Sequence, residues 1–343
     1  MTAVTHPAEA ARRAGPGIPR LTRLRGHRWT ATERAIVVAV LAIVMGSLFV
    51  ASYSLALGDP VPSHISAALV GDPTGNARTV DAVEQVASGG LDFQRYASVP
   101  AALHAIDEQT VYVALDLTSQ RPTLYVASAA GASVARVLEQ ISTADPAVRI
   151  VDTHPLGTHD PNGVEIFYLM LVATIVGFIT VLQVRANAGG IQLRRWTGFI
   201  VGLAVVASFV FTLVDGPLLG RLDLPLWESW GILALDLLAV ASFTSLMAVV
   251  MGRWAILSTW LFFVVLGNSS SGGAVAPPLL PPAFAFVSQW LPSGATVTAL
   301  RDAVYFPTYQ HPRPILVLAA WATALLVAMV VVSRRLRRSP GDP

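Results

Sequence analysis

The chain has 343 residues, of which 54% are hydrophobic and only 13% are charged, and its formal net charge is +2. Soluble domains usually carry about a quarter charged residues, so this composition predicts that lipid surrounds much of the chain. The sequence contains no cysteine, which excludes disulfides, thiolate metal sites and a cysteine nucleophile. We expect no nucleic acid among the partners, because the arginines lie where membrane topology requires them.

Six apolar runs are candidates for helices that cross the hydrocarbon core, which takes about 20 residues. The run 254–267 is short, and it reaches a full span only by including the small polar residues that follow it. The predicted spans are Ala35–Leu57, Val164–Val184, Trp196–Val214, Gly231–Met251, Trp254–Gly267 and Pro314–Ser333.

Arginine placement predicts the orientation, because short cytoplasmic segments are enriched in positive charge. With the N-terminus inside, the segments 1–34, 185–195, 252–253 and 334–343 are cytoplasmic, and they hold 15 of the 23 arginines. Both termini are then cytoplasmic in a multi-pass protein of the cell membrane. We expect a disordered basic tail over 1–34, which attracts anionic lipid. The first span resembles a signal peptide with a cleavage site after Ala56, but its long preceding tail favours an uncleaved anchor.

Residues 58–163 have the character of a separate outer domain, since charged residues recur and the apolar runs shorten. Short runs rich in valine, leucine and tyrosine alternate with helical spacing, which predicts a small α/β domain. The predicted strands are Ile65–Val70, Leu91–Tyr96, Val111–Leu117, Thr123–Ala127 and Arg149–Thr153. The predicted helices are Thr79–Ala87, Pro100–Glu108 and Ser133–Ser142. With no disulfide, we expect this domain to be held by its own core.

The end of the domain gathers two histidines and two aspartates within Asp152–Asp160. Such side chains can ligate zinc, but their spacing matches no closed site, and the interspersed proline and glycine favour a solvated connector. We therefore predict no metal and no cofactor.

The segment 268–313 is too apolar for a surface loop and too rich in proline to span the membrane. Irregular backbone at membrane depth needs protein or water around it. We predict a re-entrant segment with two short helices, Pro282–Gln289 and Ala295–Tyr305, that dip into the outer leaflet. An amphipathic hairpin lying on the membrane surface is the alternative. The predicted fold class is thus an all-α polytopic membrane protein with an inserted extracytoplasmic α/β domain and a five-helix region over 164–333.

This arrangement of spans, inserted domain and the proline-interrupted segment 268–313, hereafter the broken segment, resembles the type-2 ABC exporter permeases. Among them it resembles the branch of the phage-infection membrane proteins. The resembling residues are Ser271, Gly272, Gly273, Pro277, Leu280, Pro281, Pro282, Leu291, Pro292, Gly294, Leu300, Arg301, Tyr305 and Phe306. The resemblance implies a dimeric permease that moves an amphipathic or polymeric substrate outward, powered by a separate cytoplasmic ATPase. The chain itself is expected not to be an enzyme, since Gly71–Asn76 lacks the lysine of a phosphate-binding loop.

Ionisable residues inside the apolar segments are candidates for substrate contact or coupling, because a charge in the bilayer is costly. Asp236 lies within a span, where it relays protons or touches substrate, or is simply hydrogen-bonded to Ser229, Thr244 or a serine of a neighbouring helix. Asp215, near the outer end of its span, is predicted to be interfacial.

Further candidates lie in and around the broken segment. Arg301 is a simple surface residue, binds an anionic headgroup, or pairs with Asp236 or Asp215. The other candidates for substrate contact or coupling are Asp302, Gly272, Gly273, Pro281 and Pro292. Arg194 and Arg195 are explained by topology and also mark where a cytoplasmic ATPase would dock.

The leading hypothesis is therefore an export permease. The alternative is a membrane-anchored surface protein whose outer domain binds a ligand, an envelope polymer or a phage. An intramembrane enzyme is the weakest reading, because the spans contain no paired acid and no nucleophile with a base.

Overall fold

A computed structural model describes residues 30–58 and 61–338 of the chain. Most of the tail predicted over 1–34 lies outside the described residues, as do residues 339–343. The chain divides by its internal contacts into residues 1–43 and 44–343, and the boundary falls within the first helix, α1 (Ala31–Leu57).

In the first unit, α1 begins four residues before the predicted span. The backbone N–H of Thr30 donates to the Glu33 carboxylate at 2.7 Å, and the N–H of Glu33 donates to the Thr30 hydroxyl at 3.1 Å. This reciprocal pair is a capping box, which satisfies backbone donors that a helix start leaves open. The helix therefore starts at a polar cap rather than at the first apolar residue.

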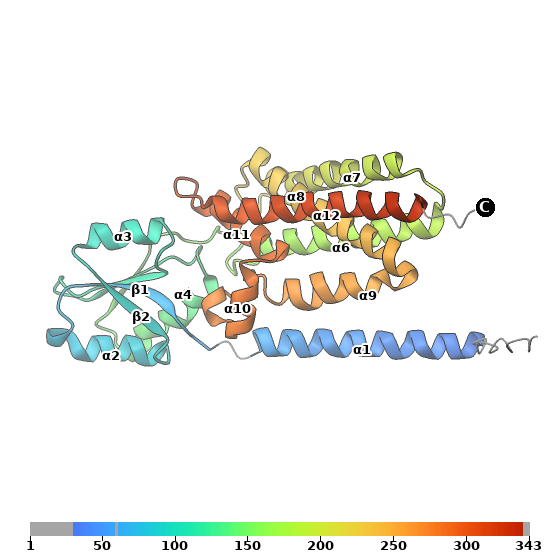
Figure 1. The fold of residues 1–343 in the computed structure, drawn as a ribbon. Helices are drawn as coiled ribbons and strands as arrows, with labels where there is room; N and C mark the ends of the chain where they lie inside the picture. Colours follow the sequence, from blue (N-terminus) through green and yellow to red (C-terminus); the bar gives the residue numbers. More distant parts are fainter. Residues whose placement is uncertain (1–29, 59–60, 339–343) are drawn as a thin grey trace, which may run out of the picture. The chain divides into compact units, whose positions relative to one another are not determined.

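The second unit contains a five-stranded sheet in the order β2-β1-β3-β4-β5 (Figure 1). The strands are β1 (Ile65–Val70), β2 (Leu91–Tyr96), β3 (Val113–Asp116), β4 (Thr123–Val126) and β5 (Arg149–Asp152). β1 pairs in parallel with β2 and β3, β4 pairs in parallel with β5, and β3 and β4 form the antiparallel pair. The prediction of an α/β region with these five strands is confirmed.

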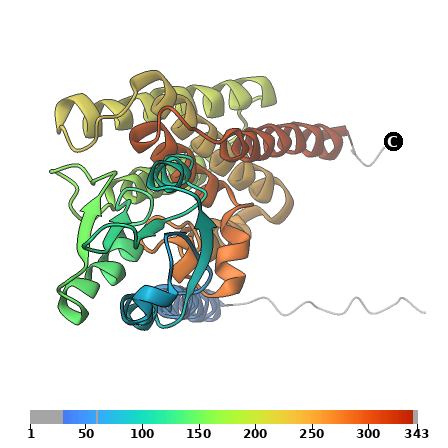
Figure 2. The ribbon, with the colours of Figure 1, turned by 90° about the vertical axis from the view of Figure 1, so that its left-hand side faces the viewer.

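Helices cover both faces of this sheet because β1 alternates its side chains with period two. Ile65, Ala67 and Leu69 pack on one face with α2 (Ala77–Val86) and α4 (Ala132–Glu139). Ala68 and Val70 pack on the other face with α3 (Val99–Asp107). Figure 2 views the sheet with these helices around it. The predicted helix over 133–142 is divided at Gln140 into α4 and the short α5 (Ile141–Ala144).

Five helical stretches are long and apolar enough to cross a membrane, and they indicate a membrane-embedded protein. They are Ala31–Leu57, Glu165–Asn187, Leu193–Leu218, Leu226–Asn268 and Pro312–Leu336. Within them, α6 (Glu165–Asn187), α7 (Leu193–Leu213) and α12 (Pro312–Arg338) pack around α8 (Leu226–Met251). A π-helical turn, η2 (Val214–Leu218), ends the third stretch.

The fourth stretch is interrupted at Gly252, whose φ of +61° lies in the left-handed region that favours glycine. After the turn η3 (Gly252–Trp254), the chain continues as α9 (Ala255–Thr259) and the π-helix η4 (Trp260–Asn268). The Thr259 hydroxyl lies 3.4 Å from that of Thr244, so α9 runs back along α8. The stretch therefore consists of two antiparallel segments, as the two predicted runs on either side of Gly252 require.

Between η4 and the last helix lie η5 (Pro277–Leu279), α10 (Pro282–Ser288) and α11 (Pro292–Tyr305). The two helices predicted in this segment are confirmed. The two helices differ in burial. Most residues of α11 are buried, and this helix packs against α8 and α12. In α10, by contrast, Phe286 is 64% exposed.

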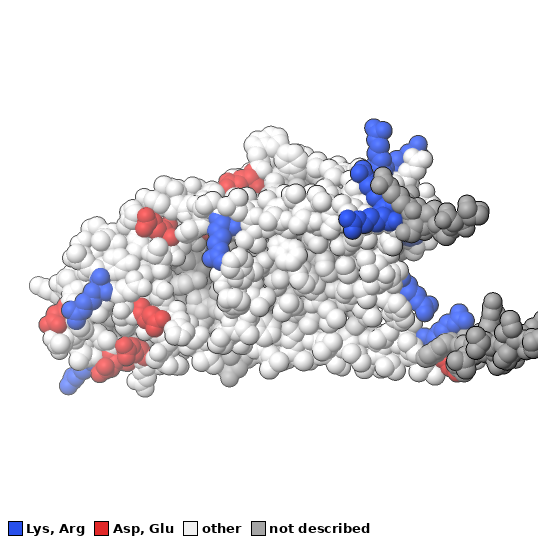
Figure 3. Space-filling model, in the orientation of Figure 1, with Lys and Arg blue, Asp and Glu red and all other residues white. Residues whose placement is uncertain are grey.

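Charged side chains in residues 44–343 gather at the two ends of the helix bundle. On the face drawn in Figure 3, arginines cluster where α12 ends, and side chains of both signs lie over the α/β region and near the start of α12, with an uncharged surface between these two groups. Arg253 lies at the α8–α9 turn, and Arg194 and Arg195 begin α7. An uncharged belt between charged ends is the pattern that a bilayer selects.

Candidate functional site

The segment before the last helix makes a close passage beside α6. Gly272 has a φ of +75°, and a Cβ on Gly273 would lie 2.8 Å from Cβ of Phe167. The Ser271 hydroxyl accepts a hydrogen bond from the Gly273 N–H at 3.3 Å. Two glycines are therefore required here, one for its backbone conformation and the other for the close approach.

From this turn the chain enters the core of the α/β region. The Ala276 N–H donates to the Ser133 hydroxyl at 2.9 Å, and the Ser63 N–H donates to the Pro278 carbonyl at 2.9 Å. Ala276 and Leu279 are buried in the core that α2 and α4 form on the sheet. Most of this core comes from the domain itself, as expected, but Ala276 and Leu279 from a segment more than a hundred residues later complete it.

The C-terminal end of α11 contacts the other face of the same sheet. Phe306 belongs to the core beneath α3, and its ring stacks on the His154 imidazole with centroids 4.7 Å apart. His154 Nε2 lies 3.6 Å from an Asp107 carboxylate oxygen. The Tyr309 hydroxyl lies 3.3 Å from His104 Nε2. The broken segment therefore contacts the α/β region on both faces of its sheet.

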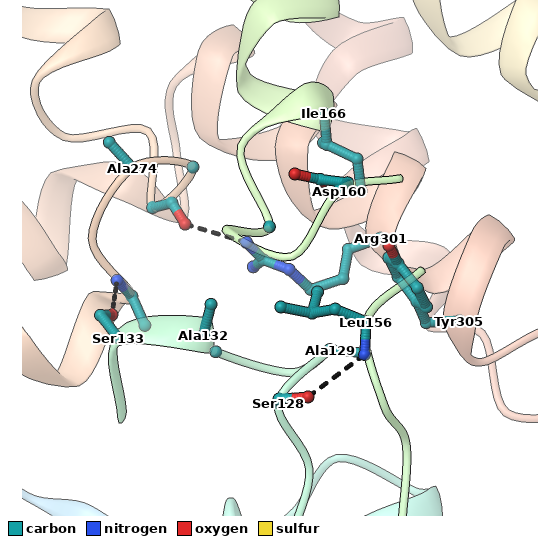
Figure 4. Close-up of a pocket in the computed structure, with 15 residues that line it drawn as sticks. Ser128, Ala129, Ala132, Ser133, Leu156, Asp160, Ile166, Ala274, Arg301 and Tyr305 are labelled. Atoms are coloured by element: carbon teal, nitrogen blue, oxygen red, sulfur yellow. Dashed lines mark hydrogen bonds between the residues drawn. The ribbon is translucent and has the colours of Figure 1, made fainter. Parts of the chain in front are cut away.

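Arg301 occupies the centre of this junction. Its Nη2 donates to the Gly272 carbonyl at 3.0 Å, and its side chain lines a small pocket with Ser128, Asp160 and Tyr305 (Figure 4). The pocket has a volume of about 10 Å³, which is room for one water molecule. Arg301 makes no ion pair with Asp236 or Asp215 and is not a simple surface residue. These predicted alternatives are wrong, because the side chain turns toward the Gly272 carbonyl.

Asp302, the next residue, is 2% exposed. Its Oδ2 accepts a hydrogen bond from the His311 backbone N–H at 3.2 Å and lies 3.8 Å from the His311 ring. Burial raises the pKa of the Asp302 carboxyl above its ordinary value. This carboxylate therefore ties the connection before α12 to α11.

The cluster of histidine and aspartate within 152–160 has structural partners. Asp160 accepts hydrogen bonds from the backbone N–H groups of Val164 (2.9 Å) and Glu165 (3.1 Å), and so caps the start of α6. Asp152 accepts a hydrogen bond from the Ser128 hydroxyl. Within residues 30–58 and 61–338, no group of three or more histidine, aspartate or glutamate side chains is placed to hold a metal ion.

Asp236 lies in the bundle interior and is fully buried. Neither of its carboxylate oxygens has a hydrogen-bond partner among the described residues. The predicted bonds to Ser229 or Thr244 are wrong, because Ser229 Oγ is itself unpartnered and the Thr244 hydroxyl donates to the Val240 carbonyl. Asp215 is 7% exposed and lies in the turn that ends the third apolar stretch, which keeps it near the end of its helix.

The remaining predicted candidates lie at helix starts. Pro281 precedes α10, and Pro292 is the first residue of α11, where a proline's missing N–H costs nothing. Arg194 and Arg195 are exposed at the start of α7. They neighbour an open cavity of about 370 Å³ whose lining includes Trp196, Val249 and Leu336.

The Arg301–Gly272 bond gives a first prediction. Arg301→Gln removes a charge-assisted donor from a half-buried carbonyl, and hydrogen bonds to charged groups contribute about 1.5–3 kcal/mol. We expect a lower apparent melting temperature in detergent, together with faster proteolysis within 272–276. Arg149→Gln serves as the control, since Arg149 is exposed on β5, and it should melt like the unchanged protein. Equal melting of both variants contradicts a holding role for Arg301.

Sequence reasoning found the residues of this junction but not their partners. The contacts of Phe306 with His154 and of Ala276 with Ser133 join positions far apart in the chain. No local pattern signals such contacts. In comparisons with known proteins, no family model, no curated protein and no solved structure matches the chain.

Proposed function

We propose that this protein is the membrane-spanning subunit of an exporter of the type-2 ABC kind, with six spans and with the α/β domain on the outer face of the cell membrane. The reversal at Gly252 supports six crossings, because it divides the longest apolar stretch into two antiparallel segments. The arginines at one end of the bundle support cytoplasmic termini. The resemblance of residues 271–306 to these permeases supports the assignment.

One observation carries the proposal. The segment between η4 and α12 is at the same time part of the bundle interior and part of the α/β core. Leu300 packs with the bundle helices, whereas Leu279 and Phe306, on either side of it, pack with the sheet. A domain that only displayed a binding surface would not need to share one segment between its own core and the interior of the helix bundle. We infer that movement of α11 in the membrane moves the outer domain with it.

In this proposal the chain supplies the path and a partner supplies the energy. The substrate is amphipathic or polymeric, two copies of the chain form the permease, and a separate ATPase docks at the end that carries Arg194 and Arg195. Contact with anionic lipid at this end would reinforce the orientation. The rival function, an anchored surface protein, needs none of these partners.

Purification in mild detergent from native membranes, with mass spectrometry of the accompanying proteins and a particle-mass measurement, tests the proposal. We expect a homodimer that brings a soluble ATPase, and we expect Arg194→Glu combined with Arg195→Glu to release that ATPase. Replacement of Arg149, exposed on β5, is the matched control and should leave it bound. A monomer that brings no ATPase, from cells whose export is unchanged when the chain is deleted, would contradict the permease and favour the anchored surface protein.

A further inference from the structure

Asp236 is a carboxylate without a partner in the middle third of α8. It is fully buried, and both of its oxygens lack hydrogen bonds among the described residues. Buried polar groups in folded proteins almost always have partners, and those that do not require an explanation such as an ion or a water molecule. The residues around Asp236 indicate which of these explanations applies.

The register of the helices shows what surrounds this carboxyl. Along the antiparallel pair of α8 and α9–η4, Thr244 faces Thr259, and Val240 packs with Phe263. One turn further toward the α/β region, the same register places Gly267 opposite Asp236. The C-terminal end of η4, where small and polar residues begin, therefore lies at the level of the Asp236 carboxyl.

The third element at this level is the start of α11. The Thr296 hydroxyl lies near the Asp236 carboxyl and donates to the Pro292 carbonyl at 2.9 Å, which leaves its oxygen lone pairs open to a cation. A Cβ on Gly267 would lie 2.7 Å from the Ser293 hydroxyl oxygen, so Ser293 packs directly on η4. α11 starts at Pro292 without a side-chain cap, and its residues from Pro292 to Val297 are all buried. Helices that begin or end inside a bundle line the substrate and ion sites of many transporters.

Two further buried side chains near this level lack partners. Ser293 Oγ and the side-chain oxygen and nitrogen of Asn268, which follows Gly267, have no hydrogen-bond partner among the described residues. Carboxylate, hydroxyl and amide oxygens are the ligands of hard cations, and a carboxylate can equally take up a proton.

No cationic side chain balances Asp236. Among the described residues it forms no ion pair, and the charged residues of the helices around it lie toward the helix ends. These residues are Glu165 and Arg185 on α6, Arg194 and Arg195 on α7, Glu228 on α8, Arg301 and Asp302 on α11, and Arg313, Arg334, Arg335, Arg337 and Arg338 on α12. The segment α9–η4 carries no charged residue. An ionised Asp236 would therefore be a buried charge without a counter-charge, and a bound proton or metal cation would neutralise it.

Buried polar side chains continue from this level toward the cavity beside Arg194. Ser242, Thr244 and Ser245 on α8 are fully buried, and Trp196 Nε1 donates to the Ser245 hydroxyl at 3.3 Å. Trp196 also lines that cavity, together with Val249. Buried hydroxyl groups thus occur along α8 between the level of Asp236 and the end of the bundle that carries this cavity.

We propose that Asp236, with the hydroxyls of Thr296 and Ser293, forms an exchangeable site for a monovalent cation, either a proton or Na⁺. A role for this site in transport rests on the proposed permease function, but cation binding itself does not. The site lies against α11, whose other end reaches the α/β domain, so occupancy is transmitted through that helix.

Infrared difference spectroscopy of the purified full chain, titrated with pH in the presence and absence of Na⁺, tests the site. We expect a protonated-carboxyl band that disappears as pH rises, is absent in Asp236→Asn, and returns at a shifted frequency in Asp236→Glu. The exposed Asp223→Asn is the matched control and should leave the band unchanged. A band that Na⁺ moves to lower pH identifies Na⁺ as a competing ligand, whereas a band insensitive to Na⁺ identifies the proton.

Two results overturn the proposal. In the first, Asp236→Asn removes no protonated-carboxyl band, so Asp236 is never protonated, and Na⁺ also leaves the band of the ionised Asp236 carboxylate unchanged. In the other, the band of Asp236 stays constant from mildly acidic to mildly alkaline pH with and without Na⁺, which means that the proton is fixed. Both readouts use the purified chain alone. A titrating Asp236 in a protein that binds no ATPase and exports nothing would leave the cation site standing and remove the permease.

Discussion

Gly294→Ala should disrupt the packing of the broken segment more than any other single methyl group. A Cβ at Gly294 would lie 2.0 Å from the Ser288 carbonyl oxygen and 2.8 Å from its carbon, and both are backbone atoms that cannot rotate away. The start of α11 must then move relative to α10. Overpacking a filled site costs about 1–3 kcal/mol and occasionally more, and a rigid neighbour favours the upper end of that range.

The measurement is the apparent melting temperature in detergent, followed by size-exclusion chromatography. Gly202→Ala is the matched control, because nothing lies within 4 Å of the position of its Cβ. Gly202 lies inside α7, where alanine is favoured over glycine by roughly 0.5–1 kcal/mol, so this variant should melt at the same or a slightly higher temperature. If Gly294→Ala melts like Gly202→Ala, α10 and α11 do not pack as described.

Asp236→Leu should have an effect of the opposite sign on stability. The carboxylate makes no hydrogen bond among the described residues, so its removal breaks none. A charged aspartate at the centre of a membrane helix costs about 2.5–3.5 kcal/mol on insertion scales, and a leucine there is favourable. We expect a higher apparent melting temperature, by an amount that corresponds to about 2 kcal/mol, together with loss of any cation-dependent function.

The control for this variant is Asp223→Leu, at an exposed position in the connection before α8, which should change the melting temperature little. A gain in stability combined with a loss of function is the signature of a residue retained for its chemistry. If both Asp236→Leu and the isosteric Asp236→Asn destabilise the protein, the carboxylate has a structural partner and the cation site is wrong.

Local patterns in the sequence predicted which strands and helices form, but not all of their bounds. The bounds predicted for β1 and β2 match the structure, because alternating apolar residues and flanking turn residues mark both strands. The helix α11 was expected because an apolar segment broken by proline needs protein around it at membrane depth, and it begins three residues before the predicted start at Ala295. The start of α1 was missed by four residues, since its cap is a polar pair that lies outside the apolar run.

The candidate site required long-range contacts that no local pattern contains. Sequence reasoning singled out Arg301 and Asp236 because charges are rare in apolar segments, and it allowed them to pair with each other. In the structure Arg301 points toward Gly272, and Asp236 faces Thr296. Thr296 and Arg301 are five positions apart on α11, more than one helical turn. Only the three-dimensional register decides between these partners.

The central claim is a six-span protein whose segment 268–313 enters the bundle from the outer side, and cysteine accessibility in intact cells tests it most directly. The chain has no cysteine, so single substitutions give an unambiguous signal. We predict that an impermeant thiol reagent labels the exposed Gln120→Cys and Thr308→Cys from outside, labels Gly189→Cys only after the membrane is opened, and leaves the buried Ala295→Cys unlabelled. Labelling of Gly189→Cys in intact cells, or of Ala295→Cys as readily as Thr308→Cys, would contradict the account.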